Sequence, residues 1–153
     1  MKKFVAVLLA AMLCLSFAAC GGEKATDKTV DAAAMFQALL TDVTYTDNAT
    51  ELDSSMAGVL LGGELPEGTE AHLAANDSAY LRCAVFACKD KDAADAVKKL
   101  VQTYIDDSID AKYNVDEVAL LQNAKIHSMG NYVAVAVTSD TDNVNKVIDQ
   151  YFA

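Results

Sequence analysis

The sequence predicts an α+β domain in which a small, mostly antiparallel sheet packs in two layers against amphipathic helices. Two observations carry this prediction. Helical and alternating apolar patterns both occur, and the predicted strands come in pairs joined by short turns. Strands joined in this way pair antiparallel, so the helices between them are expected on one face of the sheet. The arrangement is close to a split βαβ unit.

Two helices and a strand pair are expected in the first half of the domain. Asp31 or Thr29 can cap the first helix, and Gly62-Gly63 can end the second. Asn76-Asp77-Ser78 suits the turn of a hairpin. The predicted elements are a helix over 31–43, a short helix within 52–61, a weak strand over 69–75 and a firmer strand over 79–88.

The second half is expected to hold a long helix, another strand pair and a final helix. Gly130-Asn131 is a good tight-turn pair, and Ser139 or Asp140 can cap the final helix. Small residues on one face of the last strand, Ala134 and Ala136, would let a helix come close. The predicted elements are a helix over 92–109, a mixed segment over 113–122, strands over 124–129 and 132–138, and a helix over 140–152.

Residues 1–19, MKKFVAVLLAAMLCLSFAA, have the three-part form of a secretory signal peptide. Lys2 and Lys3 form a positive start, an unbroken apolar run follows, and small residues come last. The alternative is a permanent transmembrane helix. It is less favoured because the run is short for a span of about 20 residues and lacks a cationic stop.

The end of this leader, Phe17-Ala18-Ala19-Cys20, resembles the bacterial lipobox. That resemblance implies that the Cys20 thiol takes a diacylglycerol and becomes the first residue of the mature protein. Residues 20–29 would then be the lipidated cysteine and a flexible tether, and residues 30–153 a single domain. The alternative is ordinary cleavage after Ala18 or Ala19, which leaves Cys20 as a free thiol.

The chain is acidic, with 12 Lys+Arg against 22 Asp+Glu and a formal charge of −10. Loss of Lys2 and Lys3 with the leader would change this charge from −10 to −12. Such a charge argues against nucleic acid as a partner, because phosphates would be repelled. The expected partners are the cell membrane, reached at its extracytoplasmic face through the lipid, and an unknown envelope protein.

The sequence offers no recognisable catalytic constellation and predicts no cofactor. Gly-x-Ser-x-Gly, Ser-x-x-Lys and zinc-ligand spacings are absent. Cys83 and Cys88 lie five residues apart on one predicted strand and therefore point to opposite faces, so no disulfide is expected between them. His72 and His127 lie on the polar sides of their strands and are interpreted as surface residues.

Three acidic residues, Asp106, Asp107 and Asp110, crowd the end of the long predicted helix, where the helix dipole disfavours negative charge. A weakly held cation would relieve this repulsion, and solvation of the carboxylates, the favoured interpretation, would do so equally. Asp140-Thr141-Asp142 resembles the start of a calcium loop but is better explained by helix capping. Four tyrosines could line a binding surface or pack at the edges of the core; they are Tyr45, Tyr80, Tyr113 and Tyr132.

Several segments together carry a family resemblance. They are Cys20 with its two glycines, the strand and charged turn that lead into the long helix (84–109), the segment 113–124, and Gly130-Asn131-Tyr132-Val133 before the final helix. The pattern resembles a family of small uncharacterised bacterial lipoproteins catalogued as domain of unknown function 4358, and it spans essentially the chain after the leader. The family has no established activity, so the resemblance implies a location and a shape.

Three functional hypotheses follow. The leading one is a non-enzymatic binding or interaction domain of a membrane-anchored lipoprotein at the cell envelope. The second is an accessory subunit of an envelope transporter or cell-wall complex, which an apolar surface patch would favour. The third is a small envelope enzyme with an unrecognised site, which a pocket joining His72 or His127 to carboxylates would favour.

Overall fold

The computed structural model describes residues 29–111 and 114–153. The predicted leader, the lipid attachment at Cys20 and Tyr113 lie outside the described residues. Within them, no helix has the length and apolar character needed to cross a membrane. The elements are α1 (Ala32–Asp42), β1 (Thr50–Leu52), α2 (Met56–Leu61), β2 (Glu70–Ala75), β3 (Leu81–Ala87), α3 (Lys91–Ala111), α4 (Val115–Asn123), β4 (Lys125–Met129), β5 (Tyr132–Ala136) and α5 (Thr141–Phe152).

One five-stranded sheet, in the order β1-β2-β3-β5-β4, organises the domain, and all its neighbouring strands are antiparallel. Because β5 is antiparallel to both β3 and β4, these two strands run parallel to each other with β5 between them. The helical connection from β3 to β4 therefore completes a split βαβ unit. The α+β class, the antiparallel sheet and the split unit predicted from the sequence are confirmed.

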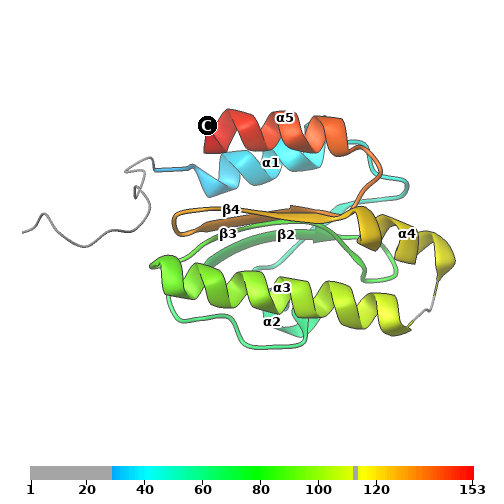
Figure 1. The fold of residues 1–153 in the computed structure, drawn as a ribbon, viewed down its shortest axis with the longest axis horizontal. Helices are drawn as coiled ribbons and strands as arrows, with labels where there is room; N and C mark the ends of the chain where they lie inside the picture. The colour runs from blue at the N-terminus through cyan, green and yellow to red at the C-terminus, as the bar shows by residue number, and fades with distance from the viewer. Residues whose placement is uncertain (1–28, 112–113) are drawn as a thin grey trace, which may run out of the picture.

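The expectation of two layers is wrong, because helices cover both faces of the sheet (Figure 1). α1 and α5 pack together on one face, and α2 and α3 lie on the other. The reason lies in the central strands β3 and β5, whose side chains are apolar and buried on both faces, apart from Arg82. A strand that is apolar on both sides needs a helix layer on each side.

Alternating residues of β3 and β5 divide the core into two halves. Ala84, Phe86, Val133 and Val135 belong to the half under α2 and α3, with Val97 and Val101 from α3. Cys83, Val85, Ala134 and Ala136 belong to the half under α1 and α5, with Phe36 and Val147 from those helices. The small side chains Ala134 and Ala136 thus lie under helices, as the sequence predicts.

Two elements differ from the sequence-based expectation. β1 was not predicted, because three residues are too few to show a strand period; the strand is defined by its pairing with β2, Thr50 opposite Ala75. The mixed segment 113–122 overlaps the helix α4, whose N-cap is Asn114. The Asn114 Oδ1 accepts hydrogen bonds from the backbone N–H groups of Asp116 and Glu117.

Most of the predicted helix-capping residues are confirmed, and so is the prediction that Cys83 and Cys88 do not form a disulfide. The Asp31 carboxylate caps α1 by accepting from the Ala34 N–H, and Gly62 ends α2 in the left-handed conformation. Asp140 lies at the N-cap position of α5, but its carboxylate accepts from the Thr44 N–H and the Asn143 side chain and caps no backbone N–H of the helix. Cys83 and Cys88 are free, buried and in opposite halves of the core.

The hairpin loop between β2 and β3 contains a strained residue. The Ala79 N–H donates to the Asn76 carbonyl, and the Asn76 N–H donates to the Tyr80 carbonyl. This is a turn closed by one residue in the left-handed region, a place that glycine usually takes. Here the residue is Ala79, with a φ of 61°, so its Cβ is held against the local backbone.

We expect Ala79→Gly to stabilise the protein by up to about 1 kcal/mol, because the relief of left-handed strain outweighs the extra entropy of a glycine in the unfolded chain. Urea denaturation would measure the free energy of unfolding. The control is Ala33→Gly at an exposed position inside α1, which should destabilise by roughly 0.5–1 kcal/mol. A loss of stability in Ala79→Gly would contradict this account of the loop.

Candidate functional site

A guanidinium group is buried at one end of the sheet. Arg82 lies on β3 and is 1% exposed. Burial of a charge without partners is very costly, so every donor must be satisfied. An arginine side chain has five N–H donors. In this structure Nε donates once and each of Nη1 and Nη2 donates twice, so the donors are fully used.

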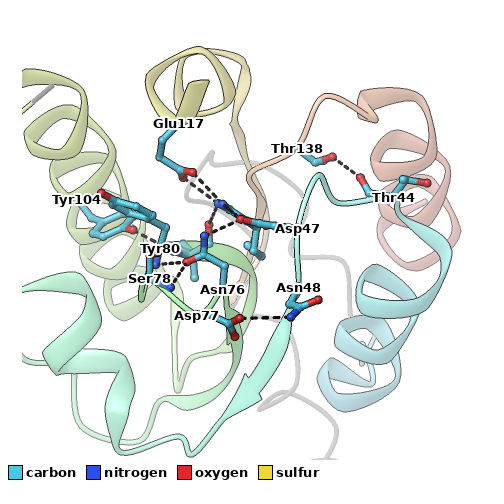
Figure 2. A network of polar contacts seen from close by, with 12 residues as sticks. Thr44, Asp47, Asn48, Asn76, Asp77, Ser78, Tyr80, Tyr104, Glu117 and Thr138 are labelled. Atoms are coloured by element: carbon cyan, nitrogen blue, oxygen red, sulfur yellow. Dashed lines mark hydrogen bonds and ion pairs between the residues drawn. The ribbon is translucent and has the colours of Figure 1, made fainter. Parts of the chain in front are cut away.

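Two carboxylates take four of these five hydrogen bonds, and each binds the guanidinium with both oxygens. Asp47 accepts from Nε at 2.6 Å and from Nη2 at 2.9 Å. Glu117 accepts from Nη1 and Nη2, both at 2.8 Å. The fifth bond goes to the Leu81 carbonyl. Figure 2 shows Asp47 and Glu117 directed toward the same point from different parts of the chain. We call Asp47, Arg82 and Glu117 the ionic cluster.

The ionic cluster stabilises the charged forms of Asp47 and Arg82. The hydrogen bonds from Arg82 lower the pKa of Asp47 to about 2, and Asn76 acts in the same direction. Burial alone would lower the pKa of Arg82, but the hydrogen bonds from Asp47 and Glu117 outweigh it, so the pKa is raised above its ordinary value. One cation and two anions leave the cluster with a net charge of −1.

Asn76 connects the ionic cluster to the strained hairpin loop. Its Nδ2 donates to Asp47 Oδ2 at 2.7 Å. Its Oδ1 accepts from the backbone N–H groups of Ser78 and Tyr80, at 3.1 and 2.8 Å. The cluster therefore joins the α1–β1 connection, the β2–β3 loop and α4, and it fixes the position of Tyr80 (Figure 2).

A cavity of about 310 Å³ opens beside the cluster, between α2, the ends of α3 and α4, and the β2–β3 loop. We call it the cleft. Its walls are mostly apolar and aromatic, with a few polar groups. The residues that matter below are Leu60, Tyr80, Tyr104, Asp107, Glu117 and Val118. Its volume lies at the small end of ligand pockets, which measure about 300–1,000 Å³.

The polar groups of the cleft differ in whether other residues of the protein already hydrogen-bond to them. The Tyr104 hydroxyl accepts from the Leu81 N–H at 3.0 Å, and burial raises the pKa of this phenol. Both oxygens of Glu117 are held by Arg82. Asp107 is exposed, and in the described part of the chain no residue hydrogen-bonds its carboxylate. The described residues that line the cleft include no lysine, arginine or histidine.

The interpretation of the two histidines as surface residues is wrong in part, because each is half-buried on the face covered by α1 and α5. His72 stacks on the Phe36 ring, with centroids 5.8 Å apart, and its Nε2 lies 2.8 Å from a Glu70 carboxylate oxygen. The Nε2 of His127 is buried without a hydrogen-bond partner in the described chain. Burial, and then Lys125, lower the pKa of His127. Neither histidine lines the cleft.

The structure gives Asp106 and Asp107, two of the three aspartates that end the long helix, different surroundings. Asp106 accepts from Gln102 Nε2 at 2.9 Å, whereas Asp107 lines the cleft. Across residues 29–111 and 114–153 there is no group of three His, Cys, Asp or Glu that could hold a metal ion. The structure therefore does not support a weak cation site formed by Asp106, Asp107 and Asp110 together.

Of the four tyrosines considered as a binding surface, Tyr80 lines the cleft. Tyr45 and Tyr132 pack in the half of the core under α1 and α5, where the Tyr45 hydroxyl donates to the Leu39 carbonyl. The structure also places Tyr104 in the lining of the cleft, a tyrosine that the sequence assigns to the apolar stripe of a helix.

Sequence reasoning missed the ionic cluster, although one signal was available. Arg82 is the only charged residue between Ala79 and Cys88, a run that otherwise reads as a buried strand. A charge inside such a run has to find partners elsewhere. Asp47 and Glu117 are each 35 residues away in the chain, so no local pattern identifies them.

The pKa of Asp47 leads to a prediction about acid stability. The unfolded chain takes up the proton at an ordinary value of 3.8 and the folded chain at about 2. Stability from this carboxylate is therefore present above about pH 4 and is lost as the pH falls toward 2. We expect the free energy of unfolding of Asp47→Asn, measured in urea at stepped pH, to fall less steeply over this interval. Asp106→Asn is the control, and an unchanged slope in Asp47→Asn would contradict the assignment.

Comparison with known proteins gives one match. A family model described as a domain of unknown function, DUF4358, matches residues 70–138. The matched region begins at β2, ends just after β5 and contains Arg82, Glu117 and most of the cleft. No curated protein and no solved structure is similar enough to be matched. The resemblance to the DUF4358 family stated from the sequence is thus confirmed over residues 70–138, where the chain matches the family model.

Proposed function

We propose that this chain is a lipoprotein held at the extracytoplasmic face of the cell membrane by acylated Cys20, and that residues 30–153 form a non-enzymatic binding domain whose site is the cleft. The lipobox-like sequence before Cys20 supports the anchor. The cleft supports the binding role, because concave, mostly apolar cavities with a few placed polar groups are typical of ligand sites.

The cleft itself is the observation that carries the binding function. It is formed by elements that the ionic cluster fixes, namely the β2–β3 loop through Asn76 and α4 through Glu117. Its shape is therefore set before a ligand arrives, which lowers the entropy cost of binding.

The chemistry of the site favours binding over catalysis. The buried carboxylate of Glu117 is tied to Arg82 through both oxygens and is not free to act as a base. The described lining of the cleft lacks histidine, cysteine and lysine. Turnover by the purified protein in a broad hydrolase panel, lost on a single substitution in the cleft, would overturn this part of the proposal.

The position of the cleft is compatible with a tethered domain. The described chain begins at one end of the domain, next to α1, whereas α4 and the C-terminal end of α3 lie toward the opposite end (Figure 1). A tether at the first end would leave the cleft at the end of the domain farther from the anchor. The acidic domain would also be repelled by anionic lipids and held off the surface.

A second candidate function, an accessory subunit of an envelope complex, is favoured by apolar side chains on α2. Met56 is 42% exposed and Val59 is 74% exposed. With Leu52 and Leu60 they border a second cavity of about 390 Å³. Loss of a protein partner in Val59→Lys, with an intact cleft, would favour this function over small-molecule binding.

The anchor is tested by substitution of the cysteine. We expect full-length Cys20→Ser to leave the membrane fraction and to mature incorrectly, because two acyl chains supply the membrane affinity. Cys14→Ser, in the leader, is the matched control and should fractionate like the parent. Membrane fractionation with mass analysis of the N-terminus measures both effects. A Cys20→Ser variant that still matures and partitions with membranes would disprove the anchor.

The binding function is tested by filling the cleft. We expect Ala111→Trp, at an exposed position that lines the cleft, to remove small molecules that co-purify with the detergent-extracted protein. Ala96→Trp places the same side chain at an exposed position of α3 outside the cleft and should retain them. Native mass spectrometry detects the bound species. Equal retention by both variants would place the binding site elsewhere.

A further inference from the structure

We infer that the cleft binds a small organic cation, an amine joined to an apolar or aromatic body. This inference rests on the proposed binding function and names the class of ligand. Three features of the cleft carry it: a carboxylate that no described residue of the lining compensates, two aromatic rings, and a helix start at which two backbone donors are already used.

The first feature is the charge. Asp107 lines the cleft without a hydrogen-bond partner in the described chain, and the ionic cluster beside it adds a net −1 through Asp47, Arg82 and Glu117. The described lining holds no basic side chain to balance this. The whole chain carries −10. An acidic site in an acidic protein attracts cations and repels anions.

The second feature is the pair of rings. Tyr80 and Tyr104 both line the cleft, and Figure 2 shows them near Glu117. A cation placed over a tyrosine face is attracted by the ring quadrupole, and this attraction grows where water is partly excluded. Leu60 and Val118 add aliphatic wall, which suits the apolar body of such a ligand.

The third feature disfavours an anionic ligand. A helix start commonly binds anions through its free N–H groups. α4 begins at the cleft, but the N–H groups of Asp116 and Glu117 already donate to Asn114 Oδ1. An anionic ligand would therefore find carboxylates and occupied donors there.

Three probes with one carbon skeleton test the ligand class: 2-phenylethylamine, 2-phenylethanol and phenylacetate. Equilibrium dialysis against the full-length protein in non-ionic detergent measures binding. The Ala111→Trp variant, whose cleft is filled, measures the background binding to the detergent and to the rest of the protein surface. We expect the amine to bind about tenfold more tightly than the alcohol, and phenylacetate not to bind above background. Added salt should weaken amine binding more than alcohol binding.

Variants at matched positions assign the effect to the cleft. Asp107→Asn should weaken amine binding about five- to tenfold and leave alcohol binding unchanged. Asp106→Asn removes the same charge one residue away, outside the cleft, and should change amine binding less than about twofold. Tyr80→Leu keeps an apolar wall but removes the ring, and should weaken the amine more than the alcohol.

Any one of the following results would overturn the inference. Amine binding that does not exceed alcohol binding, a preference for phenylacetate, equal effects of Asp107→Asn and Asp106→Asn, or no amine binding above background would each exclude an organic cation. If the alcohol or phenylacetate binds and Ala111→Trp abolishes it, the proposed binding function stands and the ligand class alone is wrong.

Discussion

The buried guanidinium of Arg82 is the constraint on which the rest of the structure depends. A charge on a central strand, 1% exposed, can be kept only if both carboxylates and one backbone carbonyl satisfy it. That requirement brings the α1–β1 connection and α4 to the same end of the sheet. Removal of either carboxylate would leave part of the guanidinium without a partner. The α1–β1 connection or α4 would then no longer be held at this end of the sheet.

The functional geometry follows from this constraint. Glu117 belongs to the ionic cluster and to the wall of the cleft, and Asn76 links Asp47 to the loop that carries Tyr80. The strained Ala79 lies in the same loop. Structural ion pairs of this kind do not have to take part in chemistry. Here the ionic cluster positions a cavity that is also lined by Asp107, a carboxylate without a hydrogen-bond partner among the described residues.

The three-layer arrangement shows where local patterns were informative and where they were not. Periodicity located the long helices and four of the five strands, and the alternation in residues 132–137 gave the correct side-chain faces. It did not reveal that the two helices at the ends of the domain, α1 and α5, pair on one face of the sheet. That pairing depends on contact between the first and last helices, which no window along the chain contains.

The sequence by itself determined the helical and strand periods, the turns at 76–78 and 130–131, the acidic charge and the resemblance over the matched family region. Each of these depends on neighbouring residues or on composition. Only the tertiary structure decided that Arg82 pairs with Asp47 and Glu117, and that Tyr80, Tyr104 and Asp107 share one cavity. The physical reason is that electrostatic and packing partners are selected by proximity in space, and that proximity exists only after both faces of the sheet are covered.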